Sequence, residues 1–263
     1  MCGRIRRSCT TAVATPNSID EYPAVSTLLS PPRGRGEETL DTPGADPGLA
    51  RRSLRDVAVA NRFFGGTRAV LQALEPLWDR LPRQATLLDV GTGMGDIPAR
   101  ARQAAARAGV TLETVGLEAS TALAAANQGI VTWPVSGDAR ALPFADHSVD
   151  VVTCSQVLHH FFDADARFVL AEMNRVARVQ AIVSDIHRSR IAAAGIWLAS
   201  FALAFHPASR HDAVVSVMRG FHASELRQMV RETVGVDASV QYRPGYRITA
   251  SWAPSLAPGP SVA

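Results

Sequence analysis

The sequence predicts an α/β protein with a mostly parallel, doubly wound sheet of seven strands that ends in an antiparallel hairpin. Three observations lead to this fold class. Short β-branched runs alternate with helical runs, a glycine-rich turn follows the first of them, and two consecutive strand-like runs close the chain. The 263 residues, of which 47% are hydrophobic, suffice for the core of one such domain. Ligands of such sheets bind at the carboxyl ends of the strands.

Two helices are predicted before the glycine turn. Ser53 has the side chain of an N-cap and precedes LRDVAVANRFF, and Thr67 is suited to cap a second helix after two glycines. Four apolar residues at helical spacing give this second helix one face for burial. They are Val70, Leu71, Leu74 and Leu77.

The strands that follow are predicted from apolar runs rich in β-branched residues. These runs are residues 86–90, 112–118, 130–135, 149–155 and 180–186. Helices are expected between them, two of which end near residues 108 and 128 and a third of which spans 165–178. A helix at about 224–234 precedes ASVQYRP and YRITASW, which predict the closing hairpin.

The predicted domain covers residues 51–252 and lies between two flexible segments. Residues 1–50 contain six prolines and no sustained period of 2 or 3.6, so we expect them to be disordered, and 253–263 should form a loose tail. No apolar segment follows the basic start MCGRIRRSC, which argues against a secretory signal, whereas a transit peptide and a misplaced start codon both stay open. A helical insertion is expected at about 188–220.

The composition argues against several classes of function. All 27 cationic residues are arginine, which rules out a P-loop lysine, a pyridoxal Schiff base and a lysine general base. The net charge is only +3 and no run of five or six cations occurs, so a nucleic-acid partner is not expected. Cys2, Cys9 and Cys154 follow neither a disulfide nor a zinc pattern, so we expect no metal and a reducing, cytoplasmic compartment.

The glycine turn LLDVGTGMGDIP carries carboxylates on both sides. Asp89 ends the predicted strand, Gly91, Gly93 and Gly95 form the turn, and Asp96 stands where a dinucleotide-binding fingerprint needs its third glycine. Because a carboxylate there would repel a pyrophosphate, the turn favours a ligand with an ammonium and a sulfonium and without phosphate.

Two further acids follow at the ends of the next strands. Glu118 ends the second strand about 25 residues beyond the turn, where an acid can accept hydrogen bonds from both hydroxyls of a ribose. Asp138, in SGDARALPF, follows the third strand and could accept from an adenine amino group, with Ala139 and Leu142 against the ring. An aspartate after glycine is also ordinary turn chemistry.

Several stretches resemble the class I S-adenosylmethionine-dependent methyltransferases, in particular the small-molecule branch similar to ubiquinone and menaquinone biosynthesis methyltransferases. They are LLDVGTGMGD, VGLEAS, GDARALPFADHSVDVVTCSQVLHHF and, more loosely, AIVSDI, and they cover Thr86 to Ile186. The resemblance implies a Rossmann-like fold and S-adenosylmethionine as cofactor.

The resemblance also implies a role for each matching residue. Glu118 departs from the pattern of the family, in which aspartate is commoner at this position, but the longer glutamate side chain still reaches the ribose. The implied contacts are Asp89, Gly91 and Gly93 with the methionine end of the cofactor, Glu118 with the ribose, Asp138 and Ala139 with the adenine, and Gln156 with the wall near the methyl group.

A histidine pair follows the fourth predicted strand and would face the transferred methyl group. His159 or His160 could remove a proton from an acceptor near neutral pH. Family members often carry histidine here for helix packing, which is the alternative.

The uncharged run of residues 191–205 is too short to span a bilayer, which takes about 20 residues. Its plain interpretation is a buried helix. The sharper hypothesis is an apolar lid over an aromatic or isoprenoid acceptor, with peripheral membrane contact. The following HPASRHD is either a surface loop or part of the acceptor site. The candidate substrate residues are Trp197, Phe201, Phe205, Arg210 and His211.

The leading hypothesis is methyl transfer from S-adenosylmethionine to oxygen or carbon of a small lipophilic acceptor, such as a phenol, quinone precursor or polyketide. A nucleic-acid methyltransferase is the second hypothesis, against which stand the missing basic stretches and the sequence SQVLHH after the fourth strand. A non-catalytic protein that binds S-adenosylmethionine is the third.

Overall fold

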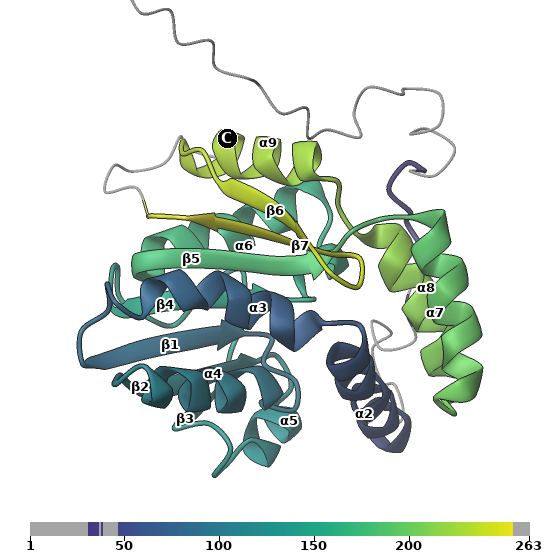
Figure 1. The fold of residues 1–263 in the computed structure, drawn as a ribbon, viewed down its shortest axis with the longest axis horizontal. Coiled ribbons are helices and arrows are strands. Elements are labelled where there is room, and N and C mark those ends of the chain that lie inside the picture. Colours follow the sequence, from purple (N-terminus) through teal and green to yellow (C-terminus); the bar gives the residue numbers. More distant parts are fainter. Residues whose placement is uncertain (1–30, 37, 39–46, 255–263) are drawn as a thin grey trace, which may run out of the picture.

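The computed structural model describes residues 31–36, 38 and 47–254. It contains one seven-stranded sheet in the order β3-β2-β1-β4-β5-β7-β6 (Figure 1). Neighbours from β3 to β5 pair parallel, and β7 pairs antiparallel with β5 and β6. The strands are β1 Gln84–Val90, β2 Thr111–Glu118, β3 Trp133–Ser136, β4 Val149–Ser155, β5 Ala177–Ile186, β6 Ser239–Arg243 and β7 Arg247–Trp252. The predicted fold class, including the closing hairpin, is confirmed.

The helices alternate with the strands as the sequence predicts, and two additional helices follow β5. The α-helices are α2 Pro47–Phe63, α3 Gly66–Leu74, α4 Asp96–Arg107, α5 Thr121–Ala126, α6 Asp163–Val176, α7 Arg190–Ala202, α8 Pro207–Arg219 and α9 Ala223–Val234. Short 3-10 turns are η3 Glu75–Leu77 and η4 Leu158–His160.

Apolar side chains form a core on each face of the sheet. Val70 and Leu74 of α3 pack with Ala101 of α4 against one face. Leu170 of α6 and Leu226 of α9 belong to the core on the other face. Strands that are buried on both faces need continuous apolar runs, which explains why β4 and β5 read as such in the sequence.

Both predicted N-caps before the glycine turn are wrong. Ser53 lies inside α2 and is buried, because the helix begins six residues earlier. Thr67 is the second residue of α3, and its hydroxyl donates to Asp96 Oδ2 at 3.2 Å instead of capping its own helix. The cap of α3 is Gly65, whose φ of 75° is a left-handed conformation that glycine adopts without strain.

The expected disorder of residues 1–50 is wrong for the part of this segment that the structure describes. Arg33 donates to the carbonyl oxygens of Arg219 and Phe161, each at 2.8 Å, and Glu38 is buried. The last residues of the segment form the first turn of α2. The other residues up to 46, and 255–263 of the predicted tail, lie outside the described part of the chain.

The interpretation of residues 191–205 as a buried helix is correct for the helix but wrong for its burial. Although α7 forms there, it exposes Trp197, Leu198 and Phe201, with 48%, 63% and 51% of their surface accessible. The predicted loop HPASRHD is the start of α8, which His206 caps. Both helices lie beyond the carboxyl ends of the strands, as α2 does (Figure 1). Among the described residues, no helix is long and apolar enough to cross a membrane.

Candidate active site

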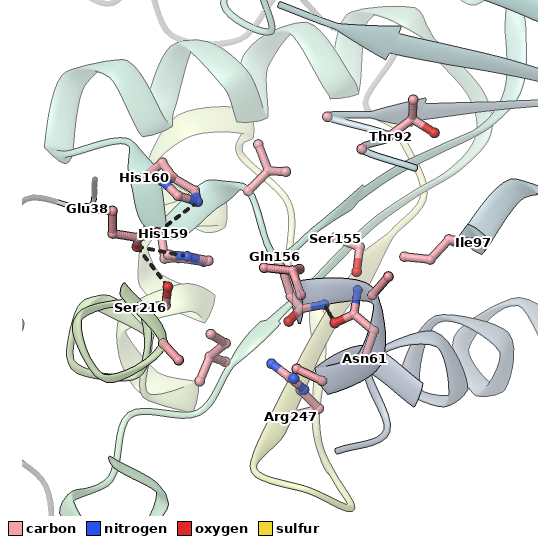
Figure 2. Close-up of a pocket in the computed structure, with 18 of the residues that line it drawn as sticks. Glu38, Asn61, Thr92, Ile97, Ser155, Gln156, His159, His160, Ser216 and Arg247 are labelled. Atoms are coloured by element: carbon pink, nitrogen blue, oxygen red, sulfur yellow. Dashed lines mark hydrogen bonds and ion pairs between the residues drawn. The ribbon is translucent and has the colours of Figure 1, made fainter. Parts of the chain in front are cut away.

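A cavity of about 940 Å³ lies at the carboxyl ends of β1, β2 and β4. The glycine turn, the ends of these strands and the histidine pair line one part of it, and α2, α7, α8 and the turn between β6 and β7 line the rest. Figure 2 shows its side chains. Cavities in doubly wound sheets are expected at this edge.

The glycine turn has a shape that side chains would prevent. Gly91 has a φ of 69°, and a Cβ atom there would collide with Val157. Its N–H and that of Thr92 donate to the carbonyl oxygen of Leu117, at 2.8 and 3.1 Å, which fixes the turn against β2. The N–H of Gly93 donates to Glu118 Oε2 at 2.9 Å. Turn and acid therefore form one unit on two neighbouring strands.

Three carboxylates surround this turn, and none of them forms an ion pair within the described residues, although the charge of Arg100 acts on Asp96. Burial raises the pKa of Asp89 to about 7, and the charges of Asp96 and Glu118 add to the increase. Burial likewise raises the pKa of Asp96 and of Glu118. Carboxylates held in this way favour a ligand that carries positive charge. These carboxylates therefore fit an ammonium and a sulfonium and are unfavourable for a phosphate.

Asp89 itself does not line the cavity. It is completely buried behind the turn, where Thr153 Oγ1 donates to its Oδ1 at 2.8 Å. Its charge can therefore act on a ligand only across the turn.

The remaining predicted cofactor residues line the cavity but differ in their exposure and in their hydrogen-bond partners. Asp138 is exposed, and both of its oxygens accept bonds from the Arg140 side chain, which lowers its pKa. Ala139 is buried at the cavity wall. Gln156 has a φ of 55°, and its side-chain amide donates to Asn61 of α2. This bond joins the end of β4 to the helix that covers it.

The histidine pair is part of a buried acid–base cluster. His159 Nδ1 lies 2.7 Å from Asp185 Oδ1, and its Nε2 points towards Glu38 Oε1 at 3.7 Å. His160 is half-buried, and its Nε2 lies 3.9 Å from Glu38 Oε2. Burial alone would raise the pKa of Asp185, but the charge and hydrogen bond of His159, together with the Ile186 N–H and His160, keep the pKa below its ordinary value. An ionised Asp185 fixes the proton on Nδ1 and leaves Nε2 as an acceptor.

Residues 88–184, which contain the glycine turn and the histidine pair, match the family described as a methyltransferase domain. A curated relative, the ubiquinone/menaquinone biosynthesis C-methyltransferase of Desulfotalea psychrophila, is 33% identical over 132 residues, which are 46% of this chain and 51% of the relative. The chain carries a class I S-adenosylmethionine-dependent methyltransferase domain. It spans about half the length of the curated relative that it matches.

Solved structures share the fold of this methyltransferase domain. An S-adenosylmethionine-dependent methyltransferase from Thermotoga maritima is 16% identical with a TM-score of 0.54, and the match covers 79% of this chain and 99% of that one. The CMeT domain of a citrinin polyketide synthase is 14% identical with a TM-score of 0.56, covering 82% of this chain and 59% of that one. These structures show the fold, whereas the match of residues 88–184 and the curated relative confirm the predicted family and its cofactor.

Glu38 belongs to the cluster but lies outside the matched methyltransferase residues. Ser216 Oγ donates to its Oε1 at 2.8 Å (Figure 2). Arg219 Nη1 lies 3.3 Å from the same oxygen. The ligand atoms of Glu38, His159 and His160 lie within 4.8 Å of one another, a spacing that a metal ion could bridge. The guanidinium of Arg219 opposes further positive charge there. No local motif indicates Glu38, because its partners are more than 100 residues away.

None of the five predicted substrate residues lines the cavity. Trp197 and Phe201 pack edge to face on the outer side of α7, with Arg210 of α8 over the Phe201 ring at 3.7 Å. His211 is exposed, and Phe205 is buried elsewhere. The opposite face of α7 lines the cavity instead, through Ile191, Ala192, Gly195 and Ile196. The aromatic residues that were predicted to line the acceptor pocket are on the face of α7 that points away from the cavity.

Sequence reasoning also missed cavity residues on two other elements. Asn61 and Phe64 lie at the end of α2, Tyr246 belongs to the turn between β6 and β7, and Arg247 begins β7. None of them stands in a recognisable motif.

Proposed function

We propose that the protein transfers the methyl group of S-adenosylmethionine to an oxygen or carbon atom of a small lipophilic acceptor, such as a phenol, quinone precursor or polyketide. The observation that carries this proposal is that one cavity contains both the glycine turn with its carboxylates and a separate acid–base cluster under apolar helices. S-adenosylmethionine supplies a methyl group on a positively charged sulfur. The chain has to bind both substrates, exclude water and accept a proton.

The cofactor would be held by the residues around the glycine turn. Gly91 and Gly93 bring the backbone close to the methionine end, and Glu118 presents its carboxylate to the ribose. Asp138 would meet the adenine from the rim, where it has to share its oxygens with Arg140. Asp89 contributes its charge from behind the turn, and Gln156 positions the wall next to the methyl group.

The proton of the acceptor would go to the histidine pair. His159, oriented by Asp185, has its acceptor nitrogen on the side of Glu38, and His160 is the more accessible of the two. A histidine base that a buried carboxylate orients is the arrangement found in known catalytic dyads and triads. We interpret Glu38 as a proton-handling partner and not as a metal ligand, because Arg219 already balances its charge. Activity should therefore be unchanged after treatment with a chelator.

The helical walls support an apolar acceptor. Val57, Phe64, Ile191 and Ile196 line the cavity, and such a lining favours a flat, apolar molecule over a nucleotide. We further propose that the acceptor is collected at a membrane surface, since the outer face of α7 exposes apolar side chains.

Two measurements on the purified full chain test the proposal. Calorimetry should detect binding of S-adenosylhomocysteine, and mass spectrometry should detect methylated products from a panel of phenols, quinols and polyketides. His160→Asn should lower turnover, whereas His211→Asn, which changes an exposed histidine outside the cavity, should not. Binding of NAD in preference to the sulfonium cofactor would overturn the assignment, and binding without any turnover would favour a non-catalytic protein.

A further inference from the structure

The cavity contains a buried arginine that the proposed methyl transfer does not use. Arg247 is only 5% exposed, yet it belongs to the lining of the cavity. It is the first residue of β7, where it pairs with Ile186 at the end of β5. Because β7 runs antiparallel to β5, its start lies at the carboxyl edge of the parallel strands, where the cavity is.

The guanidinium of Arg247 has few partners. Its Nε–H donates to the carbonyl oxygen of Phe64 at 3.3 Å, and no carboxylate within the described residues forms an ion pair with it. Arginine has five N–H donors, so most of them are not used by the residues that the structure describes. The charge of Asp185 acts on Arg247, but the oxygens of Asp185 already accept hydrogen bonds from His159 and from the N–H of Ile186.

The other fully buried arginines differ from Arg247 in this respect. Arg188 forms an ion pair with Glu225 at 2.6 Å, and Arg219 forms one with Glu38 at 3.3 Å. Arg140, which also lines the cavity, is paired with Asp138. Burial lowers the pKa of Arg247 only to about 10, so the group stays charged at neutral pH. An unpaired buried charge is unfavourable, and an anion in the cavity would offset that cost.

The surrounding backbone holds Arg247 in place for such an anion. Gly245 has a φ of 79°, and a Cβ atom there would collide with the carbonyl group of Phe64. The turn before β7 is therefore packed directly on the junction of α2 and α3. Figure 2 shows Arg247 next to Asn61 and Gln156, on the side of the cavity away from Glu38.

We propose that Arg247 binds a carboxylate group carried by the methyl acceptor. This inference rests on the proposed function and narrows its substrate class to lipophilic acids. A guanidinium fork matches a carboxylate with two parallel hydrogen bonds.

The position of Arg247 favours the acceptor over the cofactor as the source of the carboxylate. The glycine turn follows β1, which is separated from β7 by β4 and β5, or about 14 Å at the usual strand spacing. The cofactor also has a carboxylate, on its methionine end, and the experiment has to distinguish the two.

Three variants of the full chain provide the test. Arg247→Met removes the charge and keeps the length, and Arg247→Lys keeps the charge but loses the fork. Arg243→Met is the matched control, because Arg243 is a half-buried arginine on the neighbouring strand that donates to Thr249 and does not line the cavity. Without ligand, Arg247→Met should melt at or above the wild-type temperature, since it removes an unpaired buried charge.

Binding is then measured by calorimetry on protein saturated with S-adenosylhomocysteine, with two pairs of probes: benzoate and benzamide, and 4-hydroxybenzoate and its methyl ester. The wild type and Arg243→Met should bind each carboxylate at least about tenfold more tightly than its neutral counterpart, and Arg247→Met should lose this preference. Arg247→Lys should retain part of it. The affinity for S-adenosylhomocysteine should change by less than about twofold in all variants.

Three outcomes would overturn the proposal. In the first, the wild type shows no preference for the carboxylates. In the second, Arg247→Met weakens the binding of S-adenosylhomocysteine, which would assign the arginine to the cofactor. In the third, Arg247→Met melts at a lower temperature without any effect on probe binding, which would make the role of Arg247 structural. A failure of the proposed function is distinct, because the wild type would then not bind S-adenosylhomocysteine at all.

Discussion

The two sides of the cavity are built in different ways. The side that we propose for the cofactor, called the cofactor side, consists of turns that directly follow β1, β2 and β3, and its contacts, such as Gly93 with Glu118, join neighbouring strands. The side that we propose for the acceptor, called the acceptor side, is assembled from α2, α7, α8, the start of β7 and Glu38, which are distant in the sequence. The cofactor side therefore depends on local backbone geometry, and the acceptor side depends on how separate elements pack. Substitutions on the two sides should accordingly separate cofactor binding from turnover.

The largest effect is expected at the acid–base cluster. His159→Gln removes the acceptor nitrogen that Asp185 orients and should lower kcat by about a hundredfold or more. The affinity for S-adenosylhomocysteine should stay the same, because the glycine turn is not touched. Steady-state kinetics and calorimetry measure the two quantities. Unchanged turnover would mean that the histidines serve packing and that positioning alone accelerates the reaction.

Glu118→Ala should show the opposite pattern. The substitution removes the acceptor of the Gly93 N–H and of the ribose hydroxyls, which should weaken cofactor binding by about 1.5–3 kcal/mol. At saturating cofactor the turnover should be largely restored. Calorimetry with S-adenosylhomocysteine provides the measurement, and an unchanged dissociation constant would contradict the assignment of Glu118.

The pKa of Asp89 predicts a pH dependence on the cofactor side. Burial raises this pKa from 3.8 to about 7, so the folded protein retains a proton that the unfolded chain has released between these values. The contribution of Asp89 to the free energy of unfolding therefore falls as the pH rises from about 4 to about 7.

A cationic ligand should prefer the charged form of Asp89, which is populated above pH 7. Cofactor affinity should thus rise by up to about tenfold from pH 6 to pH 8. Calorimetry at several pH values checks this, and Asp89→Asn should flatten the curve. If the affinity of the wild type is equally independent of pH, the charge of Asp89 does not act on the ligand.

Removal of the N-terminal segment should lower the stability of the folded chain by a smaller amount, through contacts on the acceptor side. A chain that starts at Pro47 lacks Arg33 and Glu38, and with them the bonds to Arg219, Phe161 and Ser216. We expect its melting temperature to fall by about 2–4 °C for each kcal/mol that these contacts contribute. The control chain starts at Pro31 and keeps both residues. Equal melting temperatures of the two chains would show that the segment is dispensable.

The smallest effect on the fold is expected on the outer face of α7. Phe201 is half exposed and faces away from the cavity, so Phe201→Asp should change the free energy of unfolding by no more than about 0.5 kcal/mol beyond the lost Arg210 contact. Binding to vesicles of anionic lipid, measured by sedimentation, should decrease. A protein that fails to fold would show that this face is covered, and unchanged sedimentation would remove the proposed membrane contact.

The sequence by itself determined the cofactor side. Apolar runs of strand length specify buried parallel strands, and the residues that directly follow such strands meet at one edge of the sheet. The positions of Gly91, Glu118 and Asp138 follow from this rule alone, because each is within a few residues of a strand end. The same rule placed the histidine pair after β4. These inferences needed only local spacing, and all of these residues line the cavity.

Only the tertiary structure decided the acceptor side. Helical spacing predicts that α7 has two faces, but which face turns inward depends on the packing of α8 and α2, and the aromatic face with Trp197 and Phe201 turned outward. Glu38 and Arg247 stand in no motif. The environment of Glu38 is formed by partners that are 121 or more residues away in the sequence. The environment of Arg247 is formed by the turn that packs on Phe64. The physical reason is that a strand end fixes its neighbours by the geometry of one backbone, whereas the environment of a helix side chain is set by all elements that close around it.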